Sequence, residues 1–320
     1  MEIQRLGIEQ LPVLPKDILF IQDGSRSMKQ AKLNGCKQGL THWLNVLNEE
    51  DRFNVIAFRE DVTWCFNTWH PVHQESKQQA YTFIDRLRAQ GKTDVYASLK
   101  PLLNVERDPE RTVMAILITD GRPTMGMVES SDIIETFSRA NQSKVSVFSF
   151  GGGTRVNHFL LDLLSYKNRG DSYSVEDRQD ITRALGLWAK ALNRPVLADL
   201  SYHFSGVEDQ EIYPRILTHL YLDRPLIIYG RIKDPSIRTA FRVVGHSRGG
   251  IKRDLVFQID LSEAQEGDTD IPEQWAWHKV YHLIGKHLQT QEPDLMDEIE
   301  LLAKQYDIVV PYGDNYPVIY

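Results

Sequence analysis

The chain has 320 residues, which is long enough for one large domain or for two domains of ordinary size. Its hydrophobic content of 42% and charged content of 25% are typical of a globular protein. A net charge of −7 argues against nucleic acid or an anionic membrane as a partner, and no apolar run approaches the roughly 20 residues of a membrane span.

The amino-terminal sequence has no basic region followed by an apolar segment, so it shows no signal peptide. The chain as written is therefore predicted to be cytoplasmic, and an extracellular location is the alternative if it is a piece of a secreted precursor. Its two cysteines, Cys36 and Cys65, fall in a predicted helix and a predicted strand. Two cysteines make neither a disulfide framework nor a zinc site, so we expect free thiols. The sequence leaves the oligomeric state open.

Residues 1–16 contain two prolines and predict an irregular lead-in or an edge strand that packs on a second domain. From residue 17 onward, strand-like and helix-like segments alternate. Predicted strands cover residues 18–21, 52–58, 62–66, 112–118, 145–150 and 172–175. Predicted helices cover residues 29–48, 71–87, 95–102, 129–141, 156–165 and 178–192, and Pro71 is expected in a first helical turn. The alternation predicts an α/β domain over residues 17–194, with a Rossmann-like, doubly wound and mainly parallel sheet covered on both faces.

The pattern changes at Pro195, after which strands follow one another without helices between them. The predicted strands cover residues 196–204, 227–233, 239–244 and 252–261, and the last two form a hairpin through 245–250. Two helices, 272–290 and 294–306, and a short strand, 308–310, come next. Residues 195–320 are therefore predicted to form a smaller antiparallel β domain with carboxyl-terminal helices.

The first predicted strand ends in polar residues of one chemical kind. Asp23, Ser25 and Ser27 stand at alternate positions directly before a predicted helix. A carboxylate and two hydroxyls are hard oxygen ligands, which suit Mg²⁺ better than a soft metal. The alternative is a polar turn in which Ser25 or Ser27 caps the helix.

Two further oxygen donors are predicted at the same edge of the sheet. Asp120 follows the strongest predicted strand, and Thr93 lies in the loop that opens a helix. In open parallel sheets, ligands bind at the carboxyl ends of the strands, near the point where the strand order reverses. Two carboxylates and three hydroxyls would surround Mg²⁺ and leave one position open for a carboxylate of a ligand.

The order Asp-x-Ser-x-Ser, then Thr93, then Asp120 within Thr-Asp-Gly resembles the metal-ion-dependent adhesion site of von Willebrand factor type A domains. Other segments resemble inter-alpha-trypsin inhibitor heavy-chain-like proteins, so that the similarity extends over residues 17–320. These segments are residues 152–157, 213–215, 230–231 and 301–312.

The resemblance implies a non-catalytic module in which a metal ion engages an acidic residue of a protein partner. It implies that five residues hold or orient the ion, namely Asp23, Ser25, Ser27, Thr93 and Asp120. The ion would be Mg²⁺, with Mn²⁺ or Ca²⁺ as alternatives. Position 26 departs from the family, because Arg26 stands where glycine is common. A cation there either contacts an acidic ligand or restricts access to the ion.

An enzymatic alternative rests on the segment from Gly245 to Gly249, which fits the nucleophile-elbow pattern of α/β-hydrolases around Ser247. That elbow needs a helix after the serine. Another strand is predicted here, so the sequence favours a hairpin turn. A third alternative is a structural unit whose metal site is vestigial.

Other polar residues are interpreted without a function. His278 and His282 are spaced as two metal ligands on a helix, but the glutamate of a zinc peptidase is missing, so they are assigned to a packed aromatic face. Lys32 and Lys37 are interpreted as a solvated helix face, and no lysine or histidine base is expected near the five site residues.

Overall fold

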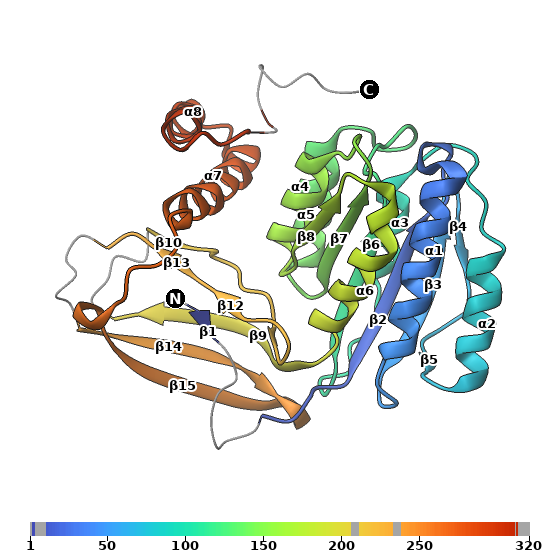
Figure 1. Ribbon diagram of the computed structural model, residues 1–320, viewed down its shortest axis with the longest axis horizontal. Coiled ribbons are helices and arrows are strands. Elements are labelled where there is room, and N and C mark those ends of the chain that lie inside the picture. The colour runs from blue at the N-terminus through green and yellow to red at the C-terminus, as the bar shows by residue number, and fades with distance from the viewer. Residues whose placement is uncertain (1, 4–10, 206–210, 233–237, 311, 313–320) are drawn as a thin grey trace.

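The computed structural model describes residues 2–3, 11–205, 211–232, 238–310 and 312. Its largest element is a seven-stranded sheet with the spatial order β4-β3-β2-β6-β7-β8 and with β5 beside β3 (Figure 1). All pairings among β3, β2, β6, β7 and β8 are parallel, whereas β4 and β5 run antiparallel to β3. The strands are β2 (Lys16–Asp23), β3 (Arg52–Phe58), β4 (Val62–Trp64), β5 (His70–Pro71), β6 (Thr112–Ile118), β7 (Ser146–Gly152) and β8 (Ser172–Val175).

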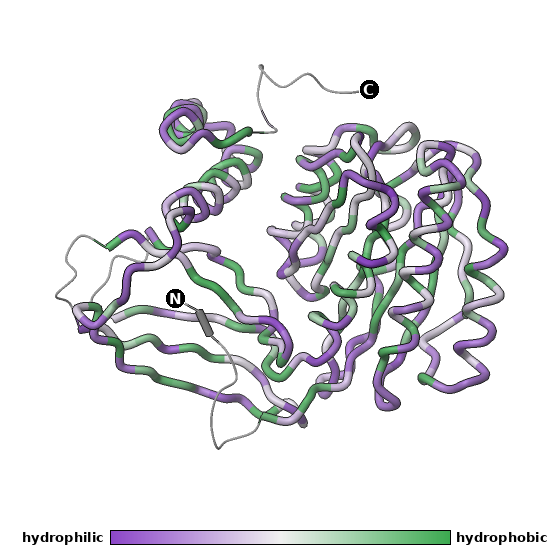
Figure 2. Tube along the Cα trace, in the orientation of Figure 1, coloured by the Kyte–Doolittle hydropathy of each residue, from purple (hydrophilic) through white to green (hydrophobic). Residues whose placement is uncertain are grey.

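Helices cover both faces of this sheet, because its central strands are apolar on both sides. In β2, Ile18 and Phe20 join one core, and Leu19 and Ile21 join the other. The first core includes α1 (Lys29–Val46), α2 (Gln74–Asp85) and α6 (Ile181–Ala191), and the second includes α3 (Val95–Leu103), α4 (Ser130–Asn141) and α5 (His158–Lys167). Figure 2 shows hydrophobic residues gathered along the interior strands and hydrophilic residues along the outer helices. The predicted doubly wound, mainly parallel sheet is confirmed.

A second, antiparallel sheet has the order β11-β9-β14-β15 and its own core. Its strands are β9 (Pro195–Phe204), β11 (Leu220–Tyr221), β14 (Arg238–Ser247) and β15 (Ile251–Asp260). Two smaller pairs accompany it, in which β1 (Glu2–Ile3) pairs with β12 (Leu226–Ile227) and β10 (Ile212–Tyr213) pairs with β13 (Tyr229–Gly230). The predicted antiparallel β region is confirmed, and β1 of the lead-in lies against it.

The carboxyl-terminal helices α7 (Ile271–Thr290) and α8 (Pro293–Tyr306) return to the first unit. Their apolar residues belong to the same core as α3, α4 and α5. The hydroxyl of Tyr281 donates to Asp162 Oδ2 at 3.0 Å, and the hydroxyl of Tyr166 donates to the His278 carbonyl at 3.2 Å. The sequence predicted both helices, but it did not predict that α7 packs against α5 or that α8 packs on α7.

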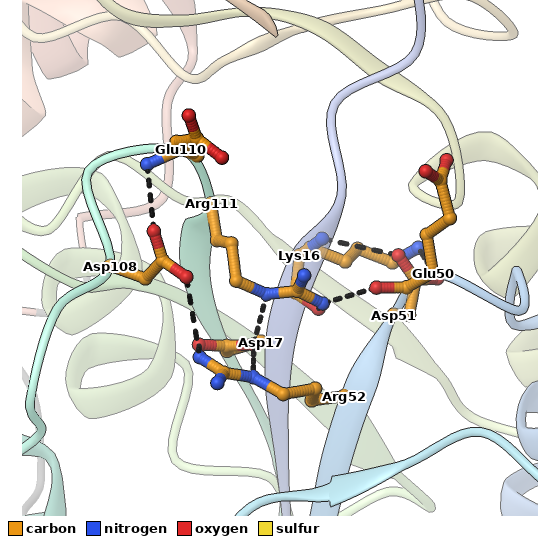
Figure 3. A network of polar contacts seen from close by, with 8 residues as sticks. All are labelled: Lys16, Asp17, Glu50, Asp51, Arg52, Asp108, Glu110 and Arg111. Atoms are coloured by element: carbon orange, nitrogen blue, oxygen red, sulfur yellow. Dashed lines mark hydrogen bonds and ion pairs between the residues drawn. The ribbon is translucent and has the colours of Figure 1, made fainter. Parts of the chain in front are cut away.

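A network of charged residues lies at the amino ends of β2, β3 and β6 (Figure 3). Asp17 is fully buried and accepts hydrogen bonds from Arg52 Nε and Arg111 Nε, each at 2.8 Å. Lys16 Nζ donates to Asp51 Oδ2 at 2.5 Å. Arg248, at the tip of the β14–β15 hairpin, pairs with Glu50 and thus joins the two sheets at this end. The charges at this end of the sheet are paired with one another within the protein.

Several predicted boundaries are wrong. Pro71 lies in β5 rather than in a helix, and α2 begins at Gln74, where Ser76 Oγ accepts the backbone N–H of His73 at 3.0 Å. The predicted strand at 227–233 is reduced to β12 and β13 over its described residues, since residue 233 lies outside them, and 308–310 is not a strand. The predicted hairpin is longer than expected, because β14 and β15 pair continuously from Arg238–Asp260 to Ser247–Ile251.

Candidate metal site

The carboxyl ends of β2 and β6 lie side by side at the centre of the main sheet. Gln22 is opposite Ile118 in their parallel pairing. After β2 the chain adds β3 on one side, and after β6 it adds β7 and β8 on the other, so the strand order reverses between β2 and β6. Open α/β sheets bind ligands at this position. Asp23 is the last residue of β2, and Asp120 lies just beyond the end of β6.

Asp23 is fully buried, and both of its carboxylate oxygens accept hydrogen bonds. Oδ1 accepts the backbone N–H of Ser25 at 2.7 Å, and Oδ2 accepts the hydroxyl of Thr119 at 2.6 Å. The hydroxyl oxygen of Thr119 also accepts the backbone N–H of Gly121 at 3.0 Å. These bonds hold the Asp23 carboxylate in one orientation against the loop that follows β6.

The hydroxyls of Ser25 and Ser27 connect the loop after β2 to Asp120. Their two Oγ atoms are 2.9 Å apart, and Ser27 Oγ donates to Asp120 Oδ1 at 3.0 Å. Within the described chain, the Ser25 hydroxyl makes no capping bond, and the residue that precedes α1 is Met28 rather than a serine. The structure therefore places Asp23, Ser25, Ser27 and Asp120 together and does not support the helix-capping alternative.

Thr93 is buried in the loop before α3, and its backbone contacts the loop that follows Asp120. Its N–H donates to the hydroxyl of Thr124 at 3.0 Å, and its carbonyl accepts the backbone N–H groups of Thr124 and Met125 at 2.9 and 3.2 Å. A second pair of bonds ties the loop after β2 to this segment, because Arg26 N–H donates to the Gly91 carbonyl at 3.2 Å and Gln90 N–H donates to the Gly24 carbonyl at 2.9 Å. The three loops that carry the predicted ligands thus form one hydrogen-bonded assembly.

Lys32 is a residue of this site that the sequence interpretation missed. It is only 7% exposed, and its Nζ donates to Asp120 Oδ2 at 3.0 Å. The prediction of a solvated face for Lys32 is therefore wrong, as is the expectation that no lysine lies near the site. The sequence did contain a sign that Lys32 is buried. At helical spacing Lys32 lies on the same face as Cys36, Gly39 and Trp43, and this face of α1 is buried.

The electrostatics of the site fit a hard divalent cation. Burial, and then the negative charge of Asp120, raise the pKa of Asp23 to about 6, although hydrogen bonds from Thr119 and Ser25 act in the opposite direction. A cation between the two carboxylates would relieve this repulsion. The donors are carboxylate and hydroxyl oxygens, which are the ligands that Mg²⁺ prefers. Across the described residues, no cluster of three or more His, Cys, Asp or Glu side chains offers a metal site of another kind.

The residues of the enzymatic alternative do not form the expected arrangement. Ser247 is the last residue of β14, a short turn and then β15 follow it, and its hydroxyl donates to the Ile251 carbonyl at 3.2 Å. No helix follows to lift that hydroxyl above a sheet, as an elbow requires. His278 packs against the rings of Tyr166, Tyr229 and Trp277, in agreement with its assignment to an aromatic face.

Comparison with known proteins identifies the unit that carries this site. Residues 16–174 match the family model described as the von Willebrand factor type A domain. The chain contains a von Willebrand factor type A domain. Domains of this type generally mediate interactions between proteins. In the described residues, no helix is both long and apolar enough to cross a bilayer.

Relatives extend the similarity beyond this von Willebrand factor type A domain. The chain is 25% identical to inter-alpha-trypsin inhibitor heavy chain H3 from Bos taurus, over 94% of this chain and 36% of the relative. It is 24% identical to heavy chain H4 from Homo sapiens, over 95% of this chain and 35% of the relative. The chain therefore spans about a third of the length of these curated relatives.

Two solved structures share the fold across both units. The von Willebrand factor type A protein from Catenulispora acidiphila matches with a TM-score of 0.60 at 14% identity, over 92% of this chain and 80% of that one. The ArnB paralog VWA2 from Sulfolobus acidocaldarius matches with a TM-score of 0.53 at 14% identity, over 92% of this chain and 82% of that one. At these identities the likeness shows the fold alone.

Proposed function

We propose that this chain is a metal-dependent protein-binding module that engages an acidic residue of its partner through a bound Mg²⁺. Asp23, Ser25, Ser27, Thr93 and Asp120 would hold or orient the ion, and Mn²⁺ or Ca²⁺ could replace it. Residues 17–194 would form the binding domain, and residues 195–320 would form a second domain that supports it. When bound, the ion supplies an open coordination position that a carboxylate of the partner fills.

The observation that carries this proposal is a hydrogen-bonded group of two buried carboxylates and two serines at the point where the strand order reverses. Buried carboxylates are costly unless cations or hydrogen bonds compensate them. The three surrounding loops are already bonded to one another, so binding of an ion needs little rearrangement.

Calorimetric titration of Mg²⁺ and Mn²⁺ into the wild-type protein tests the metal site. We expect saturable binding of one ion, and we expect Asp120→Ala to weaken it by at least about tenfold. Glu129→Ala is the matched control, because Glu129 is an exposed carboxylate before α4 that makes no capping bond. Absence of binding by the wild type, or equal binding by Asp120→Ala, would contradict the proposal and favour a vestigial site.

The ligand is tested by selection from a random peptide library on the Mg²⁺-loaded protein, with elution by EDTA. Since the open position of a hard cation prefers carboxylates, the enriched peptides should share an aspartate or glutamate. Replacement of that acid by its amide should abolish binding. Peptides that remain bound in EDTA would show a metal-independent surface instead.

A further inference from the structure

We propose that Lys32 is a built-in counter-cation that weakens the hold of the site on its metal ion and keeps the loaded site positively charged for an anionic ligand. This inference rests on the proposed function, because it concerns the charge of the same site. The geometry that supports it is the buried ion pair between Lys32 Nζ and Asp120 Oδ2 at 3.0 Å, in which the two side chains are 9% and 2% exposed.

The two oxygens of Asp120 have separate partners. Oδ1 accepts the Ser27 hydroxyl, on the side of the serines and Asp23, whereas Oδ2 accepts Lys32 Nζ. Lys32 therefore does not occupy the place between the hydroxyls and the carboxylates. It neutralises Asp120 through the other oxygen and can keep that contact when the serine side of the site is filled.

The protein encloses the stem of Lys32 as well as its charge. The stem packs beside the end of β7, because a Cβ added at Gly152 or Gly153 would lie in ordinary van der Waals contact with Lys32 Cδ, at 3.7 and 3.9 Å. Gly152 ends β7, and Lys32 belongs to α1. The lysine is thus held in place by its surroundings and is not a surface residue that happens to reach the site.

The consequence follows from counting charges. Asp23 and Asp120 carry one negative charge each when ionised, and Lys32 carries one positive charge. A divalent ion would then leave the site with one net positive charge, whereas without Lys32 the loaded site would be neutral. In a buried site a unit charge acts strongly, because solvent screens it little. Lys32 should therefore lower the affinity of the site for the metal ion and raise the affinity of the loaded site for a carboxylate ligand.

The test compares wild type, Lys32→Met and Lys37→Met by calorimetric titration with Mn²⁺ alone. Methionine keeps the length of the stem and removes the charge. Lys37 is the matched control, because it lies on the same helix and pairs with Asp85 rather than with Asp120. We expect Lys32→Met to bind Mn²⁺ about tenfold more tightly than wild type, and Lys37→Met to stay within about twofold of it.

A second measurement titrates acetate into the Mn²⁺-loaded proteins and follows the relaxation of water protons, which changes as acetate displaces water from the ion. Lys32→Met should need at least about threefold more acetate than wild type. Lys32→Gln, which is also neutral but can still donate to Asp120, keeps the test valid if Lys32→Met does not fold. Unchanged or weaker Mn²⁺ binding by the neutral variants, or unchanged acetate binding, overturns the role of Lys32 and leaves the metal site intact. A wild type that binds no Mn²⁺ overturns both proposals.

Discussion

Arg26 lies between the two serines of the candidate site, and its exposure distinguishes it from the buried Lys32. An exposed cation is screened by salt. Arg26 should therefore change the affinity for a ligand that docks above the ion more than it changes the affinity for the ion. We expect Arg26→Ala to weaken the selected acidic peptides about threefold at low salt, with a smaller change in Mn²⁺ affinity. Fluorescence anisotropy with a labelled peptide measures this. If Arg26 instead restricts access, the variant will bind the peptide more tightly.

Lys144→Ala is the control for this measurement. Lys144 is also exposed, but it precedes β7 at the amino end of that strand, away from the site. Loss of one surface charge there should leave peptide binding unchanged. An equal loss in both variants would assign the effect to net charge and not to position 26.

The residues of the site differ in how well the sequence predicts them. Asp23 and Asp120 follow apolar segments that form parallel strands, and parallel strands bring their carboxyl ends to one edge. Lys32 was missed because a lysine on a helix is usually solvated, and only its ion pair with Asp120 explains its burial. The partner comes from a strand distant in the sequence, so local pattern alone could not reveal the pair.

At the scale of elements, α1 and α6 approach each other closely because Gly39 has no side chain. A Cβ at Gly39 would lie 2.4 Å from Leu185 Cδ1, which is too short for van der Waals contact. We expect Gly39→Ala to lower the free energy of unfolding by about 2 kcal/mol, since the helices must separate or Leu185 must change rotamer. Urea denaturation measures this change.

Gly186 gives the opposite prediction within the same helix pair. It lies in α6, and nothing lies within 4 Å of a Cβ added there. Because alanine loses less conformational entropy than glycine on folding into a helix, Gly186→Ala should stabilise the protein by about 0.5–1 kcal/mol. If both substitutions destabilise the protein to the same degree, then the backbone geometry of the helices, and not the contact with Leu185, determines the cost of alanine at these positions.

The errors in element boundaries also have physical reasons. Proline suits the first turn of a helix, but His70–Pro71 instead pairs with β3, and that pairing depends on a strand that begins eighteen positions earlier in the sequence. Ile308 to Val310 has the composition of a strand, but Ile308 N–H donates to the Ala303 carbonyl at 2.9 Å and caps the carboxyl end of α8, where Asp307 adopts the left-handed conformation. Short strands need a partner, and a local pattern does not supply one.

At the scale of the whole molecule, the sequence indicated two regions but not how they are joined. The apolar faces of α7 and α8 were predictable, whereas the packing of α7 against α4 and α5 was not. His219 forms a second connection between the two sheets. Its Nδ1 accepts the Asp199 N–H of β9 at 3.2 Å, so Nε2 carries the proton and donates to Ser146 Oγ of β7 at 3.1 Å. One neutral imidazole thus connects the two sheets.

The burial of His219 predicts how the stability of the protein depends on pH. Burial lowers the pKa of His219 to about 4, with Asp199 acting in the opposite direction and Arg169 and Arg107 in the same direction. The ordinary pKa is 6.5, so the unfolded chain takes up a proton below that value while the folded protein does not. The contribution of His219 to stability is therefore complete above pH 6.5 and is lost as the pH falls toward 4. At pH 5 the loss from this residue should be about 2 kcal/mol.

His219→Gln removes this contribution. Urea denaturation at pH 7 and pH 5 should show a loss between the two pH values that is about 2 kcal/mol smaller in the variant than in wild type. Part of the loss should remain in the variant, because burial also lowers the pKa of His278 and His282 to about 4. Identical losses in wild type and variant would mean that His219 is protonated without cost in the folded state.

The charged network at the amino ends of the strands gives the last prediction, and Figure 3 shows its arrangement. Asp17 is fully buried between Arg52 and Arg111, whereas Glu50 and Arg248 form an exposed pair. Removal of one partner from a buried pair leaves the other charge uncompensated, so Asp17→Asn should lower the free energy of unfolding by about 3 kcal/mol. Water screens an exposed pair, and Glu50→Gln should therefore leave the unfolding free energy unchanged within error, even though that pair bridges the two sheets. If Glu50→Gln destabilises the protein as much as Asp17→Asn does, the junction between the sheets, and not burial, determines the strength of the network.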